Sequence, residues 1–238
     1  MTASPLPPSP SPSWWAGLRL DADLHVVPAA VRGADLSAAL ARAAASGLAH
    51  LGITAHARPD PDWFDRYVQT VRAAAALART EVHCGLEVAL LGPDGRTDLS
   101  PSLHSGLSRV DYVVLVPAPA AYRGDIAETT TLAALRAAAD LSVPVMLAAP
   151  FPDELDPDTL HALGWACARA GVGIEVSERR RSPSAAAATV LARAGATLVA
   201  GSGARSAAAI GRWDHVRTVA GALAAAPAAA PTGPSSHP

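Results

Sequence analysis

The sequence contains no lysine and no asparagine, and all 19 of its basic residues are arginine. A Schiff-base lysine and the lysine of a phosphate-binding P-loop are therefore excluded. Only two cysteines are present, Cys84 and Cys167, far apart in sequence, so the chain has neither a disulfide framework nor a paired-cysteine zinc motif. We expect both to be small buried hydrophobic side chains.

The chain also lacks a strong charge of either sign, since its formal net charge is −2 over 238 residues. This balance gives no indication of a nucleic-acid partner. No basic start followed by an apolar run marks a signal peptide, and no uninterrupted apolar stretch is long enough to span a bilayer. We therefore expect a cytoplasmic protein with no membrane partner.

Half of the residues are hydrophobic, which suits one sizeable domain with a buried core. Residues 1–13 are rich in proline and serine, and residues 227–238 are rich in alanine and proline. Neither end can bury enough apolar surface to offset the entropy of ordering, so we expect both to be disordered. The domain is expected to span residues 14–226.

Seven apolar segments of β-type alternate with helical patterns inside this domain. The candidate strands are residues 19–27, 50–55, 81–89, 110–116, 143–149, 172–177 and 196–201. Several are continuous apolar runs, which are typical of parallel strands buried on both faces. We predict an α/β fold, a distorted (β/α)7 barrel of parallel strands that is TIM-like. An open sheet is the alternative.

Polar residues stand at or just beyond the ends of three successive strands. Residues 23–27 read Asp-Leu-His-Val-Val, residues 52–56 read Gly-Ile-Thr-Ala-His, and residues 85–88 read Gly-Leu-Glu-Val. In a βα-barrel the chemistry gathers at the carboxyl ends of the strands. Two imidazoles, from His25 and His56, and a carboxylate are the beginning of a metal site.

These segments resemble the motifs of the PHP (polymerase and histidinol phosphatase) superfamily over about residues 19–215. Residues 23–27 are similar to its opening Asp-x-His-x-His pattern, residues 47–56 to its Gly-Leu…Thr-Asp-His pattern, and residues 85–87 to its Gly-Ile/Leu-Glu motif. Later strand ends of the family are similar to residues 111–117, 145–150, 173–177 and 201–206.

The resemblance implies a seven-stranded barrel and phosphoester hydrolysis by a cluster of two or three metals. Such a cluster lowers the pKa of a bound water and neutralises charge on the transferring phosphoryl group. By resemblance, His25 and Glu87 serve one metal and His56 serves another, with Zn, Mn or Fe as the expected ion. Glu87 is also the expected catalytic carboxylate.

Five positions where the family supplies ligands hold side chains that cannot coordinate a metal: Val27, Ala55, Pro117, Ala149 and Gly203. No single metal then keeps a full ligand set, so we expect metal binding to be weak or absent. We interpret the chain as a pseudoenzyme with a degenerate metal site. Replacement ligands near Glu87 in sequence are His83, Cys84 and His104, but His83 would lie about 13 Å further down the strand.

Arg205 stands where the family has a ligand histidine. We expect its guanidinium to occupy the former metal space and to pair with Glu87, so we count it with Glu87 as a catalytic candidate. A buried carboxylate needs a partner, and for Glu87 that partner is His25, an arginine or a metal. His56 is either a remnant of the site or a solvated loop residue. Solvated loop positions are expected for Arg58, Arg123, Arg179 and the run 179–181.

Three functions remain open. The first is a PHP-domain protein whose hydrolase site is reduced or lost and whose pocket binds a small phosphorylated or anionic ligand, for binding or regulation. The alternative is an active metal-dependent phosphatase of a small phosphate monoester, similar to histidinol phosphatase. The third is a structural subunit whose barrel mouth is filled by a protein partner. Trp14 and Trp15 are then a docking element, or they cap the bottom of the barrel, which is the interpretation we prefer.

Overall fold

The computed structural model describes residues 13–15, 17–28, 33–58, 60–118, 126–148 and 155–226. The two ends for which the sequence predicts disorder lie outside these residues, apart from Ser13. Two of the positions singled out above, Arg123 and Ala149, also lie outside them.

Seven parallel strands form one sheet in which neighbours in sequence are neighbours in space. They are β1 (Ala22–Val26), β2 (His50–His56), β3 (Glu81–Leu90), β4 (Tyr112–Pro117), β5 (Val145–Leu147), β6 (Val172–Ser177) and β7 (Leu198–Gly201). Each overlaps one of the predicted segments, so the predicted strands and their parallel direction are confirmed.

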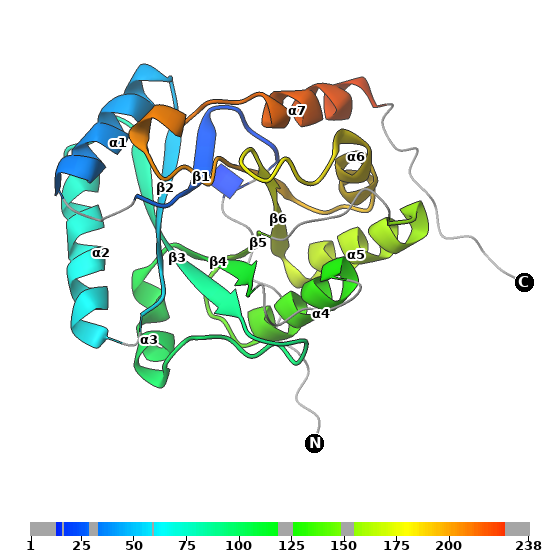
Figure 1. Ribbon diagram of the computed structural model, residues 1–238, viewed down its shortest axis with the longest axis horizontal. Coiled ribbons are helices and arrows are strands. Elements are labelled where there is room, and N and C mark those ends of the chain that lie inside the picture. The colour runs from blue at the N-terminus through cyan, green and yellow to red at the C-terminus, as the bar shows by residue number, and fades with distance from the viewer. Residues whose placement is uncertain are drawn as a thin grey trace, which may run out of the picture.

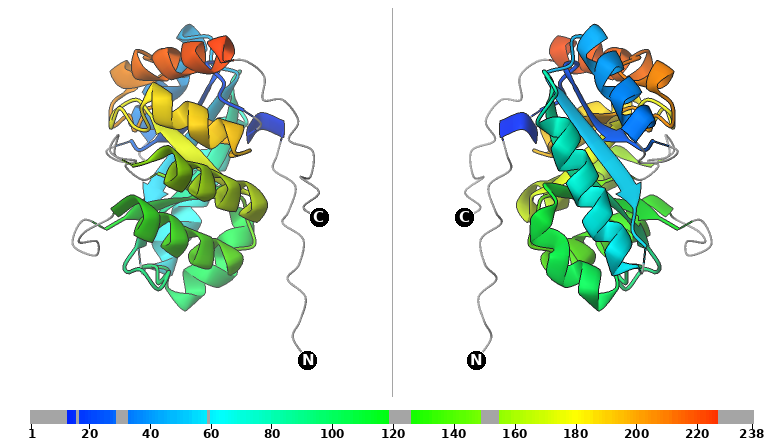
Figure 2. Two further views of the ribbon diagram at one scale, coloured as in Figure 1. Left: turned by 90° about the vertical axis from the view of Figure 1, so that its right-hand side faces the viewer. Right: turned by 90° about the vertical axis from the view of Figure 1, so that its left-hand side faces the viewer.

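Helices follow the strands and surround the sheet (Figure 1). They are α1 (Gly33–Ala45), α2 (Pro61–Ala75), α3 (Pro101–Gly106), α4 (Ile126–Ala139), α5 (Pro157–Ala170), α6 (Ala185–Arg193) and α7 (His215–Ala225), with short 3-10 turns η1 (Ser13–Trp15), η2 (Leu107–Arg109) and η3 (Ala207–Ala209). The side views show α1 and α2 on one flank and α4 to α6 on the opposite flank (Figure 2). Among the described helices, none is long and apolar enough to cross a membrane.

The sequence dictates where several helices begin. The side chains of Asp60, Ser100, Asp156 and Ser184 accept hydrogen bonds from backbone N–H groups in the first turn of the helix that follows. Three of these helices also have proline at one of the first two positions, where no N–H is needed. Sequence periodicity missed α3, because only Leu103 of its six residues is buried.

The sheet curls until β1 meets the chain that leaves β7. Val26 forms an isolated parallel bridge with Ala204, and the N–H of Gly203 donates to the carbonyl of His25 at 2.8 Å. The carboxylate of Asp23 accepts from the N–H of Ser202 at 2.9 Å. These bonds replace a full ladder between the first and last strands. The result is the predicted TIM-like (β/α)7 barrel, nearly closed.

Alternate residues of each strand serve two different cores. The larger core lies between the sheet and the helices and includes Leu86 and Val88 of β3. The smaller core fills the barrel interior with Trp15, Ala22, Leu24, Tyr112, Val114, Met146, Ala148 and Val199. Residues 50, 52, 54 and 56 of β2 and residues 81, 83, 85 and 87 of β3 alternate with outer-core residues, so they face the interior.

The bottom of the barrel, where the strands begin, is closed by η1. Trp15 is only 1 % exposed and packs edge-on against Tyr112, with ring centroids 5.7 Å apart. A Cβ atom on Gly173 of β6 would lie 2.5 Å from the indole nitrogen of Trp15, so only glycine permits this approach. Trp14 stacks on His83 beside it. The two tryptophans therefore cap the barrel bottom, as the preferred interpretation expected.

Candidate functional site

The strand ends bring His25, His56 and Glu87 together, as the sequence predicted. Nε2 of His25 lies 3.2 Å from Oε2 of Glu87, and Nδ1 of His56 lies 2.9 Å from Oε1 of the same carboxylate. The three residues come from β1, β2 and β3 in turn. One glutamate, on β3, therefore joins the imidazoles of β1 and β2 at the mouth of the barrel.

An irregularity in β1 turns His25 toward this mouth. Leu24 points into the barrel interior, whereas Val26 belongs to the outer core beneath α1. Strict alternation would place positions 24 and 26 on one face, with His25 on the other. The register between β1 and β2 shifts between Asp23 and Val26, and this break directs the imidazole inward.

Glu175 of β6 completes the cluster, although it is not among the site residues predicted from the sequence. Its Oε1 atom lies 3.0 Å from Nδ1 of His25, and its side chain is 1 % exposed. A Cβ atom on Gly201 of β7 would lie 2.2 Å from that oxygen, so the glycine leaves room for the carboxylate. The available signal was a glutamate inside an otherwise apolar strand, which needs a partner when it is buried.

The electrostatics of the cluster follow from these contacts. Burial disfavours the imidazolium of His25, but the carboxylates of Glu175 and Glu87 outweigh it and raise its pKa to about 10. Burial likewise disfavours ionised Glu87, but its hydrogen bonds with His25 and His56 lower its pKa to about 2. The hydrogen bond to Glu87 also raises the pKa of His56. Glu87 and His25 therefore form a buried ion pair at neutral pH.

Asp23 supports the site from behind without lining it. It is fully buried, and its two oxygens accept hydrogen bonds from the N–H groups of Ser202, at 2.9 Å, and Gly211, at 3.2 Å. Burial raises its pKa to about 6, although these bonds oppose the shift. The role of Asp23 is mechanical: it ties β1 to the loop after β7 and so positions His25.

Three arginines line the small cavity next to the cluster: Arg179, Arg180 and Arg205. The expected ion pair between Arg205 and Glu87 is absent from the described ion pairs, because the two histidines occupy that carboxylate. The run 179–181 is exposed, as expected of a solvated turn, yet Nη1 of Arg180 donates to the carbonyl of Ala148 at 2.5 Å. Arg58 lies over the ring of Trp63, away from the cavity lining.

Three of the five positions that lack a side-chain ligand can be placed relative to the cluster. Val27 and Gly203 line the cavity, where a ligand side chain would have reached the cluster. Gly203 has a φ of +60°, which disfavours any side chain there. Ala55 instead points into the outer core and is 7 % exposed. An aspartate at this position, as in the motif that the segment resembles, would place its carboxylate in that apolar core.

The donor atoms at the mouth are paired with one another. Both ring nitrogens of His25 already contact carboxylates, and Glu87 uses both oxygens on histidines. Among the described residues, only one group of three metal-binding side chains has ligand atoms that all lie within 4.8 Å of one another. That group is His50, Glu81 and His83, which are not at the mouth. The prediction that His25, His56 and Glu87 hold metal stays a prediction.

Comparisons with known proteins support the fold. No family model matches the chain. No curated protein matches it either. A histidinol phosphate phosphatase from Lactococcus lactis, solved with zinc, L-histidinol and phosphate, has a TM-score of 0.54 at 14% identity, over 85% of this chain and 92% of that one.

Other solved barrels are less similar. A putative dihydrodipicolinate synthase family protein from Coccidioides immitis has a TM-score of 0.46 at 15% identity, over 76% of this chain and 59% of that one. A dihydropteroate synthase from Xanthomonas albilineans has a TM-score of 0.42 at 18% identity, over 88% of this chain and 96% of that one. At such identities the likeness concerns the barrel alone, and activity has to be argued from the site.

Proposed function

We propose that this protein is a PHP-like barrel whose hydrolase site is reduced and whose mouth binds a small anionic ligand, a phosphate or phosphate monoester. The observation that carries the proposal is the charge around the mouth. Arg179, Arg180 and Arg205 line the cavity together with His25 and His56, whereas the carboxylates there are Glu87 and Glu175. Because the imidazoles of His25 and His56 contact the two glutamates, the arginines are left to attract an anion.

The size of the cavity supports a small ligand. Its volume is about 60 Å³, which is far below the roughly 300 Å³ and more that is usual for drug-sized ligands. Glu178 does not line this cavity, and its carboxylate accepts hydrogen bonds from the N–H groups of Asp214, His215 and Val216 at the start of α7. A single phosphate group beside Arg205 suits this space and charge.

The second candidate is a working metal-dependent phosphatase of a small phosphate monoester. One contact favours it: Glu175 holds Nδ1 of His25, and metal-binding histidines are commonly oriented by a carboxylate in this way. The paired state of Glu87 and the five substituted ligand positions weigh against it. We therefore favour the first candidate, in which the mouth binds a ligand or serves regulation without turnover.

One sample tests both candidates. We expect 31P NMR or calorimetry to detect binding of inorganic phosphate or an aryl phosphate, with no turnover under added Zn²⁺, Mn²⁺ or Fe²⁺. Arg205→Ala should weaken binding at least about tenfold, because it removes a charge-assisted contact worth about 1.5–3 kcal/mol. Arg193→Ala, in the last turn of α6 at the opposite end of the barrel, should not.

Two results would overturn the proposal. Metal-dependent turnover of the aryl phosphate that disappears in Glu87→Gln would establish the phosphatase instead. Phosphate binding that responds equally to Arg205→Ala and Arg193→Ala would show that the arginines at the mouth form no site.

A further inference from the structure

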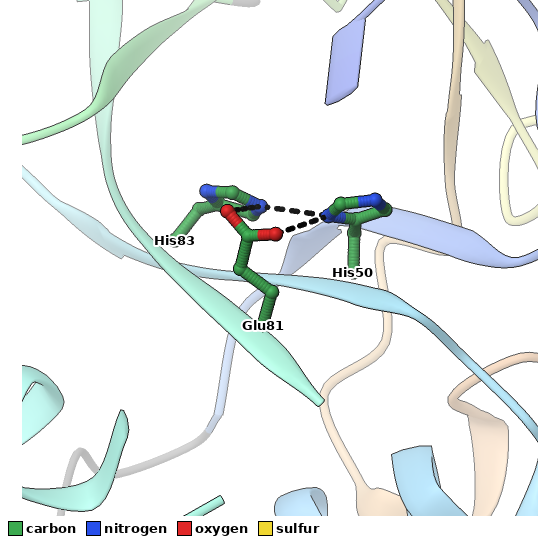
Figure 3. Close-up of side chains that lie close together, drawn as sticks. All are labelled: His50, Glu81 and His83. Atoms are coloured by element: carbon green, nitrogen blue, oxygen red, sulfur yellow. Dashed lines mark hydrogen bonds and ion pairs between the residues drawn. The ribbon is translucent and has the colours of Figure 1, made fainter. Parts of the chain in front are cut away.

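A second cluster of metal-binding side chains lies at the other end of the barrel. His50, Glu81 and His83 point toward one another there (Figure 3). Nδ1 of His50 lies 3.2 Å from Nε2 of His83 and 3.4 Å from Oε2 of Glu81. Nε2 of His83 lies 3.8 Å from Oε1 of Glu81. One ligand atom from each residue falls within 4.8 Å of the other two.

The pairing of two strands produces this convergence. In the parallel register of β2 and β3, His50 stands opposite Glu81, and Gly52 stands opposite His83. All three cluster residues face the barrel interior, because their neighbours Leu51 and Val82 belong to the outer core. The sequence separation of 31 to 33 residues hides this arrangement from a motif search.

We propose that His50, Glu81 and His83 bind one divalent transition-metal ion of the zinc class. Two imidazoles and a carboxylate suit Zn²⁺, Co²⁺ or Ni²⁺ and not Ca²⁺ or Mg²⁺, which prefer oxygen alone. A tetrahedral ion with bonds of about 2.0–2.1 Å holds its ligand atoms about 3.3 Å apart. The two imidazole nitrogens, 3.2 Å apart, already match that spacing. His50 and His83 approach different oxygens of the Glu81 carboxylate, at 3.4 and 3.8 Å, and one ligand atom from each of the three residues lies within 4.8 Å of the others, so a rotation of the exposed Glu81 side chain completes the set.

The surroundings complete a three-ligand site with an open fourth position. Glu81 is 61% exposed on its side chain, so an ion can enter from solvent and keep a water molecule. His83 is 5% exposed and is held by Trp14, whose ring stacks on it at 4.0 Å between centroids. The carboxylate of Asp21, near His50, is occupied by Arg19 at 2.7 Å and supplies no ligand.

A hydrogen bond between the two imidazoles accounts for their contact but not for the glutamate. In that arrangement one ring donates its proton to the other. Neutral imidazoles bind an ion without releasing a proton, because the proton moves to the far nitrogen of the same ring. The ion would then cross-link β2 and β3 at the barrel bottom. It would also hold the ring of His83 against which Trp14 stacks.

This site is independent of the proposed function. His50 and His56 stand at opposite ends of the interior face of β2, about 20 Å apart at the rise of a strand. Metal at the bottom and anion at the mouth can therefore be tested separately on the same full-length chain.

The experiment is a titration of chelator-treated protein with Zn²⁺ by calorimetry and with Co²⁺ by visible absorption. We expect one ion per chain and the absorption of tetrahedral Co²⁺. Glu81→Gln and His50→Gln should each weaken Zn²⁺ binding at least about tenfold. Loss of a residue that only hydrogen-bonds to a metal ligand already costs about tenfold or more in metal affinity, and these two residues are ligands. Glu128→Gln, exposed on α4, and His56→Gln, at the mouth, are matched controls that should bind as wild type does. Bound Co²⁺ should quench tryptophan fluorescence less in Trp14→Phe.

The outcomes separate cleanly. Absence of Zn²⁺ binding to the wild-type chain at micromolar concentration would overturn the inference and leave the anion site untouched. Binding that survives Glu81→Gln and His50→Gln but is lost in His56→Gln would also overturn it, because the ion would then lie at the mouth.

Discussion

Nδ1 of His25 lies 3.0 Å from Oε1 of Glu175, although 150 residues separate them in the chain. Their strands, β1 and β6, are not paired with each other, because β7 lies between them. The contact forms across the mouth of the barrel and leaves the other ring nitrogen for Glu87. Each prediction about the mouth depends on this chain of carboxylate, imidazole and carboxylate.

Replacing Glu87 by glutamine should lower the pKa values of both His25 and His56. The neutral amide removes the charge that raises their pKa values, so both should titrate at lower pH, with His56 returning toward its usual range. Loss of one partner of a largely buried pair should also cost about 1–3 kcal/mol of unfolding free energy. NMR titration of the imidazoles and urea unfolding measure the two effects. Glu128→Gln is the control, and an unchanged titration of His56 in Glu87→Gln would contradict the geometry.

The cluster should confer stability over a limited range of pH. The pKa of Glu87 is lowered from 4.5 to about 2, so its contribution is present above pH 4.5 and is lost as the pH falls toward 2. The pKa of His25 is raised from 6.5 to about 10, so its contribution is full below pH 6.5 and is lost as the pH rises toward 10. Both contributions are complete only between about pH 4.5 and 6.5.

Buried Asp23 acts in the opposite sense at the acid side of that range. Its pKa rises from 3.8 to about 6 on folding, so the cost of burying its charge is relieved as the pH falls from 6 to 3.8. Asp23 is present in both wild type and Glu87→Gln, so the difference between them reports on Glu87. Because Glu87 becomes protonated toward pH 2, urea unfolding should give a smaller difference between the two proteins at pH 2 than at pH 6. A difference that is constant with pH would argue against the ion pair.

A methyl group at position 201 should disturb the mouth specifically. In Gly201→Ala the new Cβ would lie 2.2 Å from Oε1 of Glu175 and 2.9 Å from Cβ of His25. We expect a loss of about 1–3 kcal/mol from overpacking and a fall in the pKa of His25 as the glutamate is displaced. Gly221→Ala, on an exposed face of α7 with no atom within 4 Å, should instead gain about 0.5–1 kcal/mol. Equal effects of the two substitutions on unfolding would refute the close approach.

Removing the indole of Trp15 should open the bottom of the barrel. Trp15→Ala leaves a cavity beside Tyr112 and should reduce the free energy of unfolding by about 3–5 kcal/mol. Trp165→Ala, half-exposed on α5, is the matched control and should cost under about 1 kcal/mol. Thermal or urea unfolding of both variants measures these losses. A small loss of unfolding free energy in Trp15→Ala would mean that η1 is not part of the core.

The sequence by itself determined the succession of strands and helices. Continuous apolar runs such as β4 extend over only a few residues, so local patterning reveals them. Because parallel strands end at one edge, the same patterning also placed His25, His56 and Glu87 at one mouth. The short helix α3 escaped because it buries too few side chains to show a period.

Only the tertiary structure decided how those side chains are used. The irregularity of β1 turned His25, the curl of the sheet brought Glu175 to it, and the histidines took the carboxylate of Glu87 that Arg205 was expected to hold. The register of β2 and β3 assembled His50, Glu81 and His83 at the other end. Register and closure depend on packing of the whole barrel, because no local pattern fixes which residues of distant strands stand level with one another.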